Sequence, residues 1–502
     1  MVFRVNAVKE LSEYFSVIMH LNYIQALLGW DQQVNMMGYK SVVGKGDQIA
    51  LIQQLLHKRL TSEKLGKLIN DAEKVKNLSD IESAIIRESK RAYEQEIKLP
   101  EELVIEIAKT TTLAQQVWQE ARKKNNFKLF QPLLEKIIEL QIEKAKKLET
   151  HPDLYSTLID LFEPSGTYDW INGVFKPIKS KLKDFVKKLA SSSNKPDDSI
   201  FKKHYNPDKQ FELSHKIIEK LQFDFSRGRQ DRSTHPFTTS LAALDTRITT
   251  RTTEPFPDCI TSTIHECGHA LYEMGIKEEL HNTILCQGTS MAIHESQSRM
   301  WENFIGRSKE FWTYWYPIFQ QYFAENLKNY PLEEFHRAIN IVEPSFIRVN
   351  ADEVSYGLHI ILRFELEKSL IDRKIQVNEL PELWNSKFEE LLGIIPPDDT
   401  KGVLQDVHWS SGYFGYFPTY FLGNLYAGQI YSYALKLNPN FPQDYEKGEF
   451  SGLLTYLREN IHQYGSIYRA NDLIKRVTGE ALNPEYFLKY IEQKYYPIYK
   501  IS

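Results

Sequence analysis

Hydrophobic residues recur at three- and four-residue spacing along most of the chain, which is the period of an amphipathic helix. The pattern predicts helices over residues 8–28, 81–97, 103–117, 129–145, 174–189 and 211–221. It continues over residues 354–370, 383–394 and 416–435. Glycine and proline number only 23 and 21 among 502 residues, so few residues interrupt these helices. We therefore expect a protein of the all-α class.

One segment departs from the helical period. Residues 245–253 read DTRITTRTT, in which β-branched threonines alternate with other side chains. This alternation predicts a strand. A helix is expected directly afterwards, over residues 258–274. The fold class is thus mostly helical, with a small β-sheet beside the helix that carries the candidate chemistry.

Chain length and loop-forming segments bear on domain organisation. A chain of 502 residues corresponds to roughly three domains by length alone. No repeat at a solenoid period is visible. The segment 190–198, ASSSNKPDD, is the best candidate for a hinge, and an ordinary surface turn is the alternative.

Composition and charge exclude several classes of protein. The formal net charge is −4 and no basic blocks occur, which argues against nucleic-acid binding. No apolar run reaches the length of a transmembrane helix, and Arg4, Lys9 and Glu10 interrupt the first residues where a signal peptide would be apolar. Three cysteines are too few for a disulfide scaffold. We expect a cytoplasmic protein.

The helix expected over residues 258–274 contains the motif H-E-x-x-H at His265, Glu266 and His269. The two histidines lie about 40° apart around such a helix and one turn along it, so both imidazoles can bind one Zn²⁺. Glu266 lies beside the metal, where it can take a proton from a water molecule. Cys267 falls on the opposite face, as a core residue. The alternative is a helix with two half-buried, hydrogen-bonded histidines.

Zinc needs a third protein ligand and an open position for water. A second helix is expected over residues 291–304, and it offers Glu295, 26 positions after His269. A glutamate in this role defines the gluzincin arrangement. His294 is the rival ligand, but it lies about 100° from Glu295 around the helix, so both are not expected to bind together. We favour Glu295.

Six short motifs follow one another along the chain. They are HPF at 235–237, DxRxT at 245–249, HExxH at 265–269, HESQ at 294–297, IRxxAD at 347–352 and GxxQDxHW at 402–409. In this order they resemble the carboxypeptidase Taq family, thermostable metallocarboxypeptidases of peptidase family 32. The likeness spans nearly the whole chain. One position departs from many gluzincins: Arg299 stands four residues after Glu295, where an aspartate often orients a ligand histidine.

The resemblance implies a metal-dependent carboxypeptidase that removes one residue at a time from the C-terminus of peptides. It implies a helical fold with a deep groove, broadly like neurolysin and angiotensin-converting enzyme. Residues 1–502 would form a single peptidase unit, in which 1–195 make one groove wall and 196–502 carry the zinc site. Members are typically homodimers that use Zn²⁺, for which Co²⁺ often substitutes. The expected partners are peptides with a free C-terminus, and neither nucleic acid nor a membrane.

Peptide hydrolysis also needs donors for the oxyanion and a proton for the leaving amine. The segment HWSSGYFGYFPTY offers His408 and Tyr420. The family's helical relatives use a histidine and a tyrosine in such a segment. Tyr413 and Tyr416 are rival donors, and simple packing is the alternative for Tyr420.

An exopeptidase must recognise the free carboxylate of its substrate, and an arginine fork can bind a carboxylate through two hydrogen bonds. Arg348 and Arg247 both stand in family motifs. Either arginine can serve; we favour Arg348, with Arg247 as its rival, and the two can also act together. The alternative for each arginine is a structural ion pair, with Asp352 or Asp245 respectively.

The remaining expected substrate-binding residues are His235, Asp245, Gln405 and Asp406. Of these, we expect Gln405 and Asp406 to shape the site rather than to react. The strand at 245–253 is expected to pair with an extended peptide backbone, as sheet edges do. Two other functions stay open at this point. One is a zinc oligopeptidase that cleaves internally, and the other is a helical peptide-binding protein without activity.

Overall fold

The computed structural model describes residues 6–35, 38–252 and 256–501, and contacts along the chain divide it into two compact units. The first unit comprises Met1–Ile97, Asp198–Ile339 and Ile430–Ala481. The second comprises Lys98–Asp197, Asn340–Gln429 and Leu482–Ser502. Neither unit is a continuous stretch of sequence. One passage between them, from residue 197 to 198, lies in the loop expected as a hinge.

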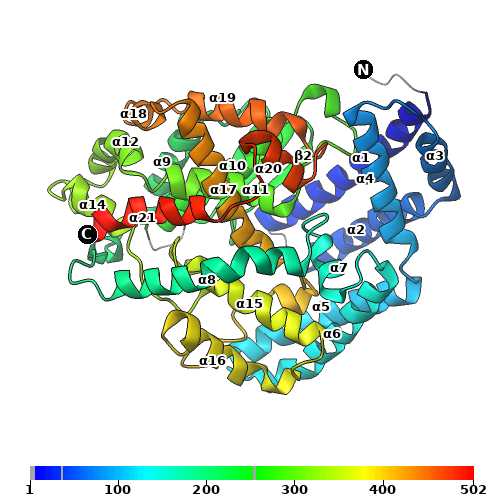
Figure 1. The fold of residues 1–502 in the computed structure, drawn as a ribbon, viewed down its shortest axis with the longest axis horizontal. Helices are drawn as coiled ribbons and strands as arrows, with labels where there is room; N and C mark the ends of the chain where they lie inside the picture. The colour runs from blue at the N-terminus through cyan, green and yellow to red at the C-terminus, as the bar shows by residue number, and fades with distance from the viewer. Residues whose placement is uncertain (1–5, 36–37, 253–255, 502) are drawn as a thin grey trace. The chain divides into compact units, whose positions relative to one another are not determined.

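The first unit is mainly helical (Figure 1). Its α-helices are α1 (Asn6–Val34), α2 (Tyr39–Leu60), α3 (Glu63–Glu73), α4 (Asp80–Ile97), α9 (Pro207–Lys220), α10 (Asp258–Met274), α11 (Met291–Arg299), α12 (Lys309–Tyr322), α13 (Ala324–Leu327), α14 (Leu332–Ile339), α18 (Phe441–Tyr445), α19 (Ser451–Asn460) and α20 (Ala470–Thr478). A π-helical segment, Met300–Ile305, continues α11 directly.

The second unit is also helical. Its α-helices are α5 (Glu101–Lys123), α6 (Phe127–Leu148), α7 (Leu154–Asp160), α8 (Tyr168–Ala190), α15 (Tyr356–Ile371), α16 (Leu380–Leu392) and α21 (Glu485–Tyr499). Helix α17 (Phe417–Leu437) begins in this unit and ends in the first. Short 3₁₀ turns at Arg348–Asn350 and His408–Ser411 carry residues of the expected site.

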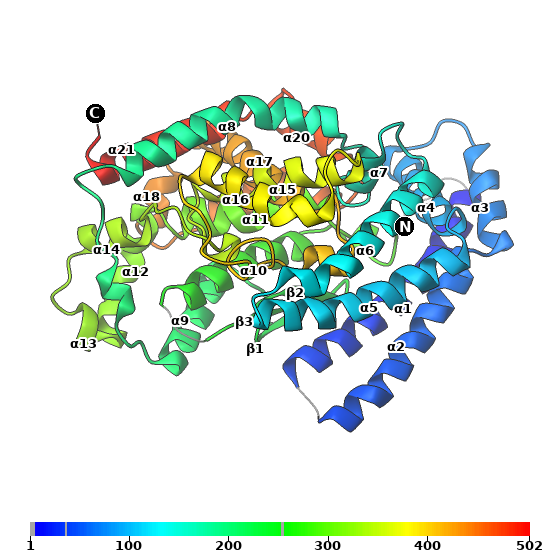
Figure 2. The ribbon, with the colours of Figure 1, turned by 90° about the horizontal axis from the view of Figure 1, so that it is seen from below.

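Three strands of the first unit form one sheet in the order β1-β3-β2 (Figure 2). They are β1 (Gly228–Arg232), β2 (Thr238–Ala242) and β3 (Asp245–Thr250). β3 pairs with β1 in parallel and with β2 in antiparallel orientation. Because β3 is paired on both sides, it has no edge for a substrate, and the expectation that it pairs with a peptide is wrong. The free edges belong to β1 and β2.

Hydrophobic spacing explains how α1 is held in the first unit. Val8, Leu11, Phe15 and Ile18 lie on one face of the helix and are all buried. This face packs in a core shared with α3, α4 and the segment 276–286. Burying each of these side chains stabilises the fold by about 1.5–3 kcal/mol. Helix α10 packs against α9, α11 and β3, which places the candidate motif in the interior of this unit.

The core of the second unit is rich in aromatic contacts. Phe364 on α15 stacks on Tyr168 with ring centroids 5.1 Å apart, and it meets Phe175 edge-on at 5.4 Å. Tyr155 on α7 completes the cluster, 5.8 Å from Phe364. The aromatic residues therefore connect α7, α8 and α15.

The predicted helices are confirmed, but some of their ends differ by up to six residues, as at the end of α1, the end of α5 and the start of α8. Helix α16 stops at Leu392 because Gly393 takes the left-handed conformation, with φ of 73°. Helix α15 starts at Tyr356, because Asp352 accepts the backbone N–H groups of Val354 and Ser355 in the turn before it. The predicted helix over residues 258–274 matches α10.

The predicted strand is confirmed as β3 over Asp245–Thr250, while residues 251–252 lie outside it and residue 253 is outside the described residues. The mostly helical class with a small sheet is also confirmed. Within residues 6–35, 38–252 and 256–501, no helix combines the length and the apolar character that crossing a membrane requires. The groove wall expected of residues 1–195 and the likeness to neurolysin and angiotensin-converting enzyme stay predictions.

Candidate metal centre

Helices α10 and α11 approach each other very closely, and a glycine permits it. A Cβ atom on Gly268 would lie 2.6 Å from the Cα atom of Ser298 and 2.8 Å from the carbonyl oxygen of Gln297. Any side chain at this position would push the two helices apart. Helix α11 begins at a hydrogen bond from the Ile293 N–H to the Ser290 hydroxyl, 3.1 Å long. Glu295 thus lies just after the first turn of α11 and faces α10.

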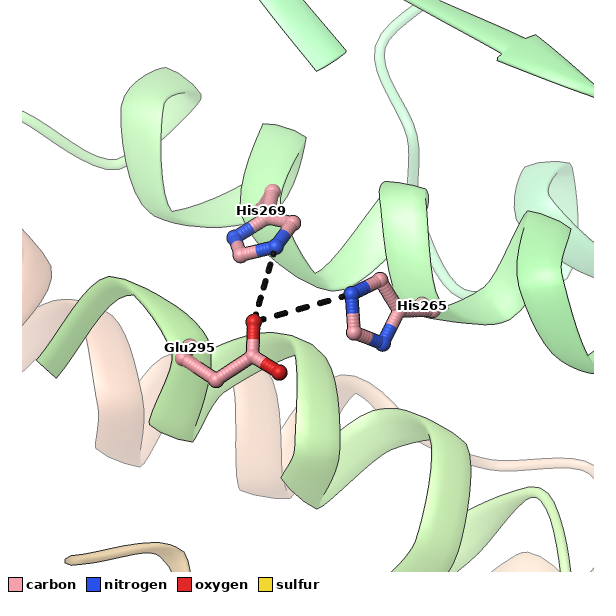
Figure 3. Close-up of side chains that lie close together, drawn as sticks. All are labelled: His265, His269 and Glu295. Carbon is pink, nitrogen blue, oxygen red and sulfur yellow. Dashed lines mark ion pairs between the residues drawn. The ribbon is translucent and has the colours of Figure 1, made fainter. Parts of the chain in front are cut away.

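Three potential ligand side chains converge where the helices meet. Nε2 of His265 lies 3.7 Å from Oε2 of Glu295, and Nε2 of His269 lies 3.5 Å from the same oxygen. Figure 3 shows both imidazoles on one helix pointing at the carboxylate on the other. One ligand atom from each residue lies within 4.8 Å of the others.

These separations fit a metal ion better than direct hydrogen bonds. Donors around a tetrahedral zinc, at bond lengths of about 2.0–2.1 Å, are roughly 3.3 Å apart. Both imidazole–carboxylate distances exceed 3.4 Å, too long for strong N–H···O bonds. Arg299 Nε donates to Oε1 of Glu295 at 2.7 Å, so the other oxygen faces the histidines. Two nitrogens and one oxygen are a donor set that zinc binds readily.

Each histidine of the cluster has a second partner through Nδ1. Nδ1 of His265 lies 2.9 Å from Oε2 of Glu302, in the π-helical segment. Nδ1 of His269 lies 2.5 Å from Nδ1 of His294, whose Nε2 lies 2.7 Å from Oε1 of Glu273. Both nitrogens of His294 therefore face protein partners, and this residue stands outside the cluster of three.

The carboxylates of the centre are held ionised by nearby cations. Burial works to raise the pKa of Glu295, but Arg299 and His265 outweigh it and hold that pKa well below its usual range. Glu302 is balanced in the same way: burial raises its pKa, while Arg299, then His265, lower it to about 2. Both side chains are therefore anionic over the whole physiological range, as a cation site requires.

The two histidines differ in their proton affinity. For His265, burial lowers the pKa, but the negative charge of Glu295 and Glu302 outweighs it, so the net pKa is raised. For His269, burial lowers the pKa to about 3, and His294 adds to that effect. A metal ligand must be neutral imidazole, so the low pKa of His269 favours metal binding, whereas the raised pKa of His265 makes protons stronger competitors for its ring.

Glu266 lies beside the cluster and is held by the edge strand of the sheet. The hydroxyl of Thr238 on β2 donates to Oε2 of Glu266, with 2.7 Å between the oxygens. The same hydroxyl lies 2.9 Å from the backbone oxygen of Glu266. Burial raises the pKa of this carboxyl, which makes it a stronger base than an exposed glutamate. Cys267, on the opposite face of α10, is buried as expected.

The other expected residues of the first unit lie on or near the sheet. Arg247 forms a two-point ion pair with Asp245, with Nε–Oδ1 and Nη2–Oδ2 distances of 2.9 and 2.8 Å. This is the structural pair considered from the sequence. The guanidinium also stacks over Trp30, with 4.5 Å from Cζ to the ring centroid. His235 is exposed, and its backbone oxygen accepts a hydrogen bond from Ser233.

Five expected residues gather in the second unit. The backbone N–H of Arg348 donates to Gln405, and its guanidinium pairs with Asp406 at 2.9 Å and stacks 5.0 Å over Tyr420. Nε2 of His408 lies 3.1 Å from the Tyr420 hydroxyl. Arg348 thus pairs with Asp406 rather than with Asp352, the partner considered from the sequence.

A second arginine, buried Arg363 on α15, binds the other oxygen of Asp406, with Nε–Oδ2 of 2.7 Å. Burial works to raise the pKa of Asp406, but Arg348 and Arg363 outweigh it and hold that pKa well below normal. Two guanidinium groups share one carboxylate, so the three side chains together carry a net positive charge.

The imidazole of His408 is neutral at physiological pH and can form hydrogen bonds in that form. Burial lowers its pKa to about 3, and Arg348 strengthens the effect. Within the described part of the chain, its buried Nδ1 atom has no hydrogen-bond partner. Of the rival donors, Tyr416 lies 5.2 Å from Tyr420 between ring centroids, and Tyr413, which is 49% exposed, lies 6.0 Å from Tyr416.

Three neighbours of the expected residues were not predicted. Glu302 follows Glu295 by seven residues, nearly two helical turns, so it returns to the same face, and this spacing was readable in the sequence. Thr238 and Arg363 gave no such signal, because they meet their partners only through folding.

Comparison with known proteins agrees with these observations. The family described as carboxypeptidase Taq (M32) metallopeptidase matches residues 10–495. Carboxypeptidase 1 of Bacillus subtilis is 40% identical over 498 residues, covering 98% of each chain. Thermostable carboxypeptidase 1 of Thermus thermophilus is 38% identical over 507 residues, covering 98% of this chain and 99% of the relative.

Solved structures show the same likeness. The M32 carboxypeptidase from Deinococcus radiodurans R1 superposes with a TM-score of 0.96 at 34% identity, covering 99% of this chain and 100% of that one. The carboxypeptidase of Pyrococcus furiosus gives a TM-score of 0.95 at 37% identity, with the same coverage. The chain therefore belongs to the carboxypeptidase Taq (M32) family of metallopeptidases.

Proposed function

We propose that this chain is a zinc-dependent carboxypeptidase that releases single residues from the free C-terminus of peptides. Its family makes it a metal-dependent peptidase, a hydrolase of peptide bonds. The observation that supports the proposal most strongly is the convergence of His265, His269 and Glu295 from two helices. We assign these three residues as the metal ligands, and Co²⁺ as a working substitute for Zn²⁺.

Zinc held by His265, His269 and Glu295 would supply Lewis acidity for the scissile carbonyl group and the attacking water. Glu266 acts as the general base: its carboxylate takes a proton from the attacking water and delivers it to the leaving amine. Thr238 holds the carboxylate in place through the hydrogen bond to Oε2. Glu302 orients the ring of His265 through its contact with Nδ1.

The charged cluster of the second unit supports the assignment of Arg348 to the substrate carboxylate. Arg348 and Arg363 share the single carboxylate of Asp406, so these three side chains carry a net positive charge that attracts an anion. A peptide's terminal carboxylate is such an anion. Gln405 orients Arg348 through its backbone N–H. Arg247, Asp245 and His235 are assigned to substrate binding on the family resemblance alone.

His408 and Tyr420 are assigned as donors to the developing oxyanion. Nε2 of His408 and the Tyr420 hydroxyl are in mutual hydrogen-bond contact, which uses one proton; when the histidine is neutral and this contact opens, each side chain has one proton to donate. We also propose, on the resemblance alone, that the protein is a cytoplasmic homodimer and that it takes free peptides as substrates.

The test compares two peptides of one sequence, one with a free C-terminus and one amidated. We expect the parent protein to cleave the free acid, and to cleave the amide far more slowly. Arg348→Ala should lose most activity on the free acid, through a higher KM. Equal cleavage of both peptides by parent and variant would contradict the carboxypeptidase assignment and favour an oligopeptidase.

A further inference from the structure

His294 lies between two side chains of α10 that are one turn apart. Its Nδ1 atom meets Nδ1 of His269 at 2.5 Å, and its Nε2 atom meets Oε1 of Glu273 at 2.7 Å. The series Glu273, His294, His269 therefore runs without a break to Nε2 of His269, which faces Glu295 at 3.5 Å. His265 has no such intermediary, because Glu302 contacts it directly at 2.9 Å.

The chemistry of the facing atoms fixes where the protons lie. A carboxylate only accepts hydrogen bonds, so the ring proton of His294 lies on Nε2, toward Glu273. Nδ1 of His294 then has a lone pair, and His269 must donate its own proton from Nδ1. The lone pair of His269 is thereby left on Nε2, the atom a metal needs. With the opposite arrangement, a proton on Nε2 would block the ligand atom.

We propose that Glu273 and His294 are positioning residues, which hold His269 in the tautomer and orientation that bind the metal and so set the metal affinity of the centre. The inference rests on the metal-dependent function proposed above. It gives the histidine of the HESQ motif a role that is neither that of a ligand nor that of simple packing.

Packing contacts also fix the orientation of the His294 ring. Tyr272 on α10 lies 5.2 Å away between ring centroids. On another side, a Cβ atom on Gly288 would lie 2.6 Å from Cδ2 of His294, so only glycine leaves room for the ring. The backbone of Gly288 is outside the positive-φ region, so alanine fits the backbone but not the space. Gly288→Ala would thus shift His294 without removing a nitrogen.

The first test measures the dissociation constant of Zn²⁺ from the full chain, by competition with a chelator. His294→Leu removes the acceptor for His269, and we expect a dissociation constant about 10- to 100-fold higher. His294→Asn puts an amide oxygen near the place of Nδ1 and should restore most of the affinity. The matched control is His215 on α9, which faces Gln230 at 3.3 Å outside this series. His215→Leu and His215→Asn should leave the constant unchanged.

A second pair of variants tests the far end of the series. Glu273→Gln keeps an oxygen acceptor for Nε2 of His294 and should bind zinc nearly as the parent does. Glu273→Met removes the acceptor, allows His294 to hold its proton on either nitrogen, and should weaken binding. The visible absorption of the Co²⁺ form provides a readout independent of activity. It should change in His294→Leu and Glu273→Met, and stay parental in the conservative variants.

Two results would overturn the inference. One is parental zinc affinity and Co²⁺ absorption in His294→Leu. The other is an equally large loss in His294→Asn and His294→Leu, which would assign the effect to packing of the ring. If His294→Leu does not fold, Gly288→Ala replaces it, and unchanged affinity there counts against the inference. A parent protein that binds no zinc would instead refute the proposed function itself, so the two failures are distinguishable.

Discussion

At the residue scale, the proposed chemistry depends most directly on Glu266. Its side chain is buried next to the two histidines of the cluster, and the Thr238 hydroxyl fixes one carboxylate oxygen. Glu266 is not one of the three converging ligand residues. Its removal should therefore separate metal binding from turnover.

We expect Glu266→Gln to bind one zinc per chain with parental affinity and to lose about 10²–10⁴-fold in kcat, because only the base is removed. The measurement pairs metal analysis with steady-state hydrolysis of a free-acid peptide. Thr238→Ser, which keeps the hydroxyl, is the matched control and should stay close to the parent. Full activity in Glu266→Gln would remove this residue from the mechanism.

Much of the metal cluster could be predicted from residue spacing, because helix geometry alone brings His265 and His269 to one side. The residues that contact the Nδ1 atoms of these two histidines were harder to predict. Glu302 follows Glu295 by nearly two helical turns and so lies on the same face, and its contact with His265 could have been predicted from that spacing. The contact between His294 and His269 could not, because it depends on the distance between two helices.

At the scale of elements, the contact between α10 and α11 decides whether Glu295 can reach the histidines. Gly268 is the residue that lets the helices meet, since an added Cβ would lie 2.6 Å from backbone atoms of Ser298. Backbone atoms cannot rotate away as a flexible side chain can. The contact is therefore intolerant of even one methyl group.

Gly268→Ala should force the helices apart, cost about 1–3 kcal/mol of stability and weaken zinc binding. Gly29→Ala on α1 is the matched control, because an added Cβ there meets nothing within 4 Å. We expect the control to be neutral or slightly stabilising, since alanine favours a helix. Thermal unfolding and chelator competition measure the two effects. Identical behaviour of both variants would contradict the proposed role of the close contact.

A buried carboxylate connects the elements that carry His408. Glu367 on α15 accepts hydrogen bonds from Tyr155, Trp409 and the backbone N–H of Gly415, at 2.7, 2.8 and 2.9 Å. Burial raises its pKa from 4.5 to about 7, although these three donors lower it. The folded protein therefore keeps a proton here that the unfolded chain loses above pH 4.5.

This difference predicts a pH effect on stability. The contribution of Glu367 to the free energy of unfolding is fully present below pH 4.5. It is lost as the pH rises through about 7, at about 1.4 kcal/mol per pH unit. Glu367→Gln does not titrate, so from pH 5.5 to 7.5 the parent should lose roughly 2 kcal/mol relative to the variant. Urea unfolding at both pH values measures it. If the free energies of unfolding of parent and variant differ by the same amount at both pH values, the effect is ruled out.

Sequence patterns predicted most helices and the central strand, but neither of its neighbours. β1, read as GRQDR, shows no alternation of apolar and polar residues, because it lies at the edge of the sheet and is partly exposed. Its pairing partner is β3, which follows it only after β2. The π-helical turn after α11 was also unpredicted, because it continues an uninterrupted helical pattern.

At the scale of the whole molecule, each unit contains one group of expected site residues. The first holds His265, His269, Glu295 and Glu266, and the second holds Arg348 and Asp406 with His408 and Tyr420. Each unit draws on three separate stretches of chain, so local patterns could not reveal which residues share a unit. The resemblance of the six motifs to a known family predicted both groups, whereas spacing alone predicted only the three candidate ligands and Glu266.

The central claim is that the converging ligands make this chain a metal-dependent enzyme acting at peptide C-termini. Mass spectrometry of a short unblocked peptide, incubated with the zinc-loaded full chain beside a chelator-treated sample, tests it most directly. We expect a series of products shortened one residue at a time from the C-terminus, and none with the chelator. Internal fragments, or products that persist in the chelator, would contradict the claim.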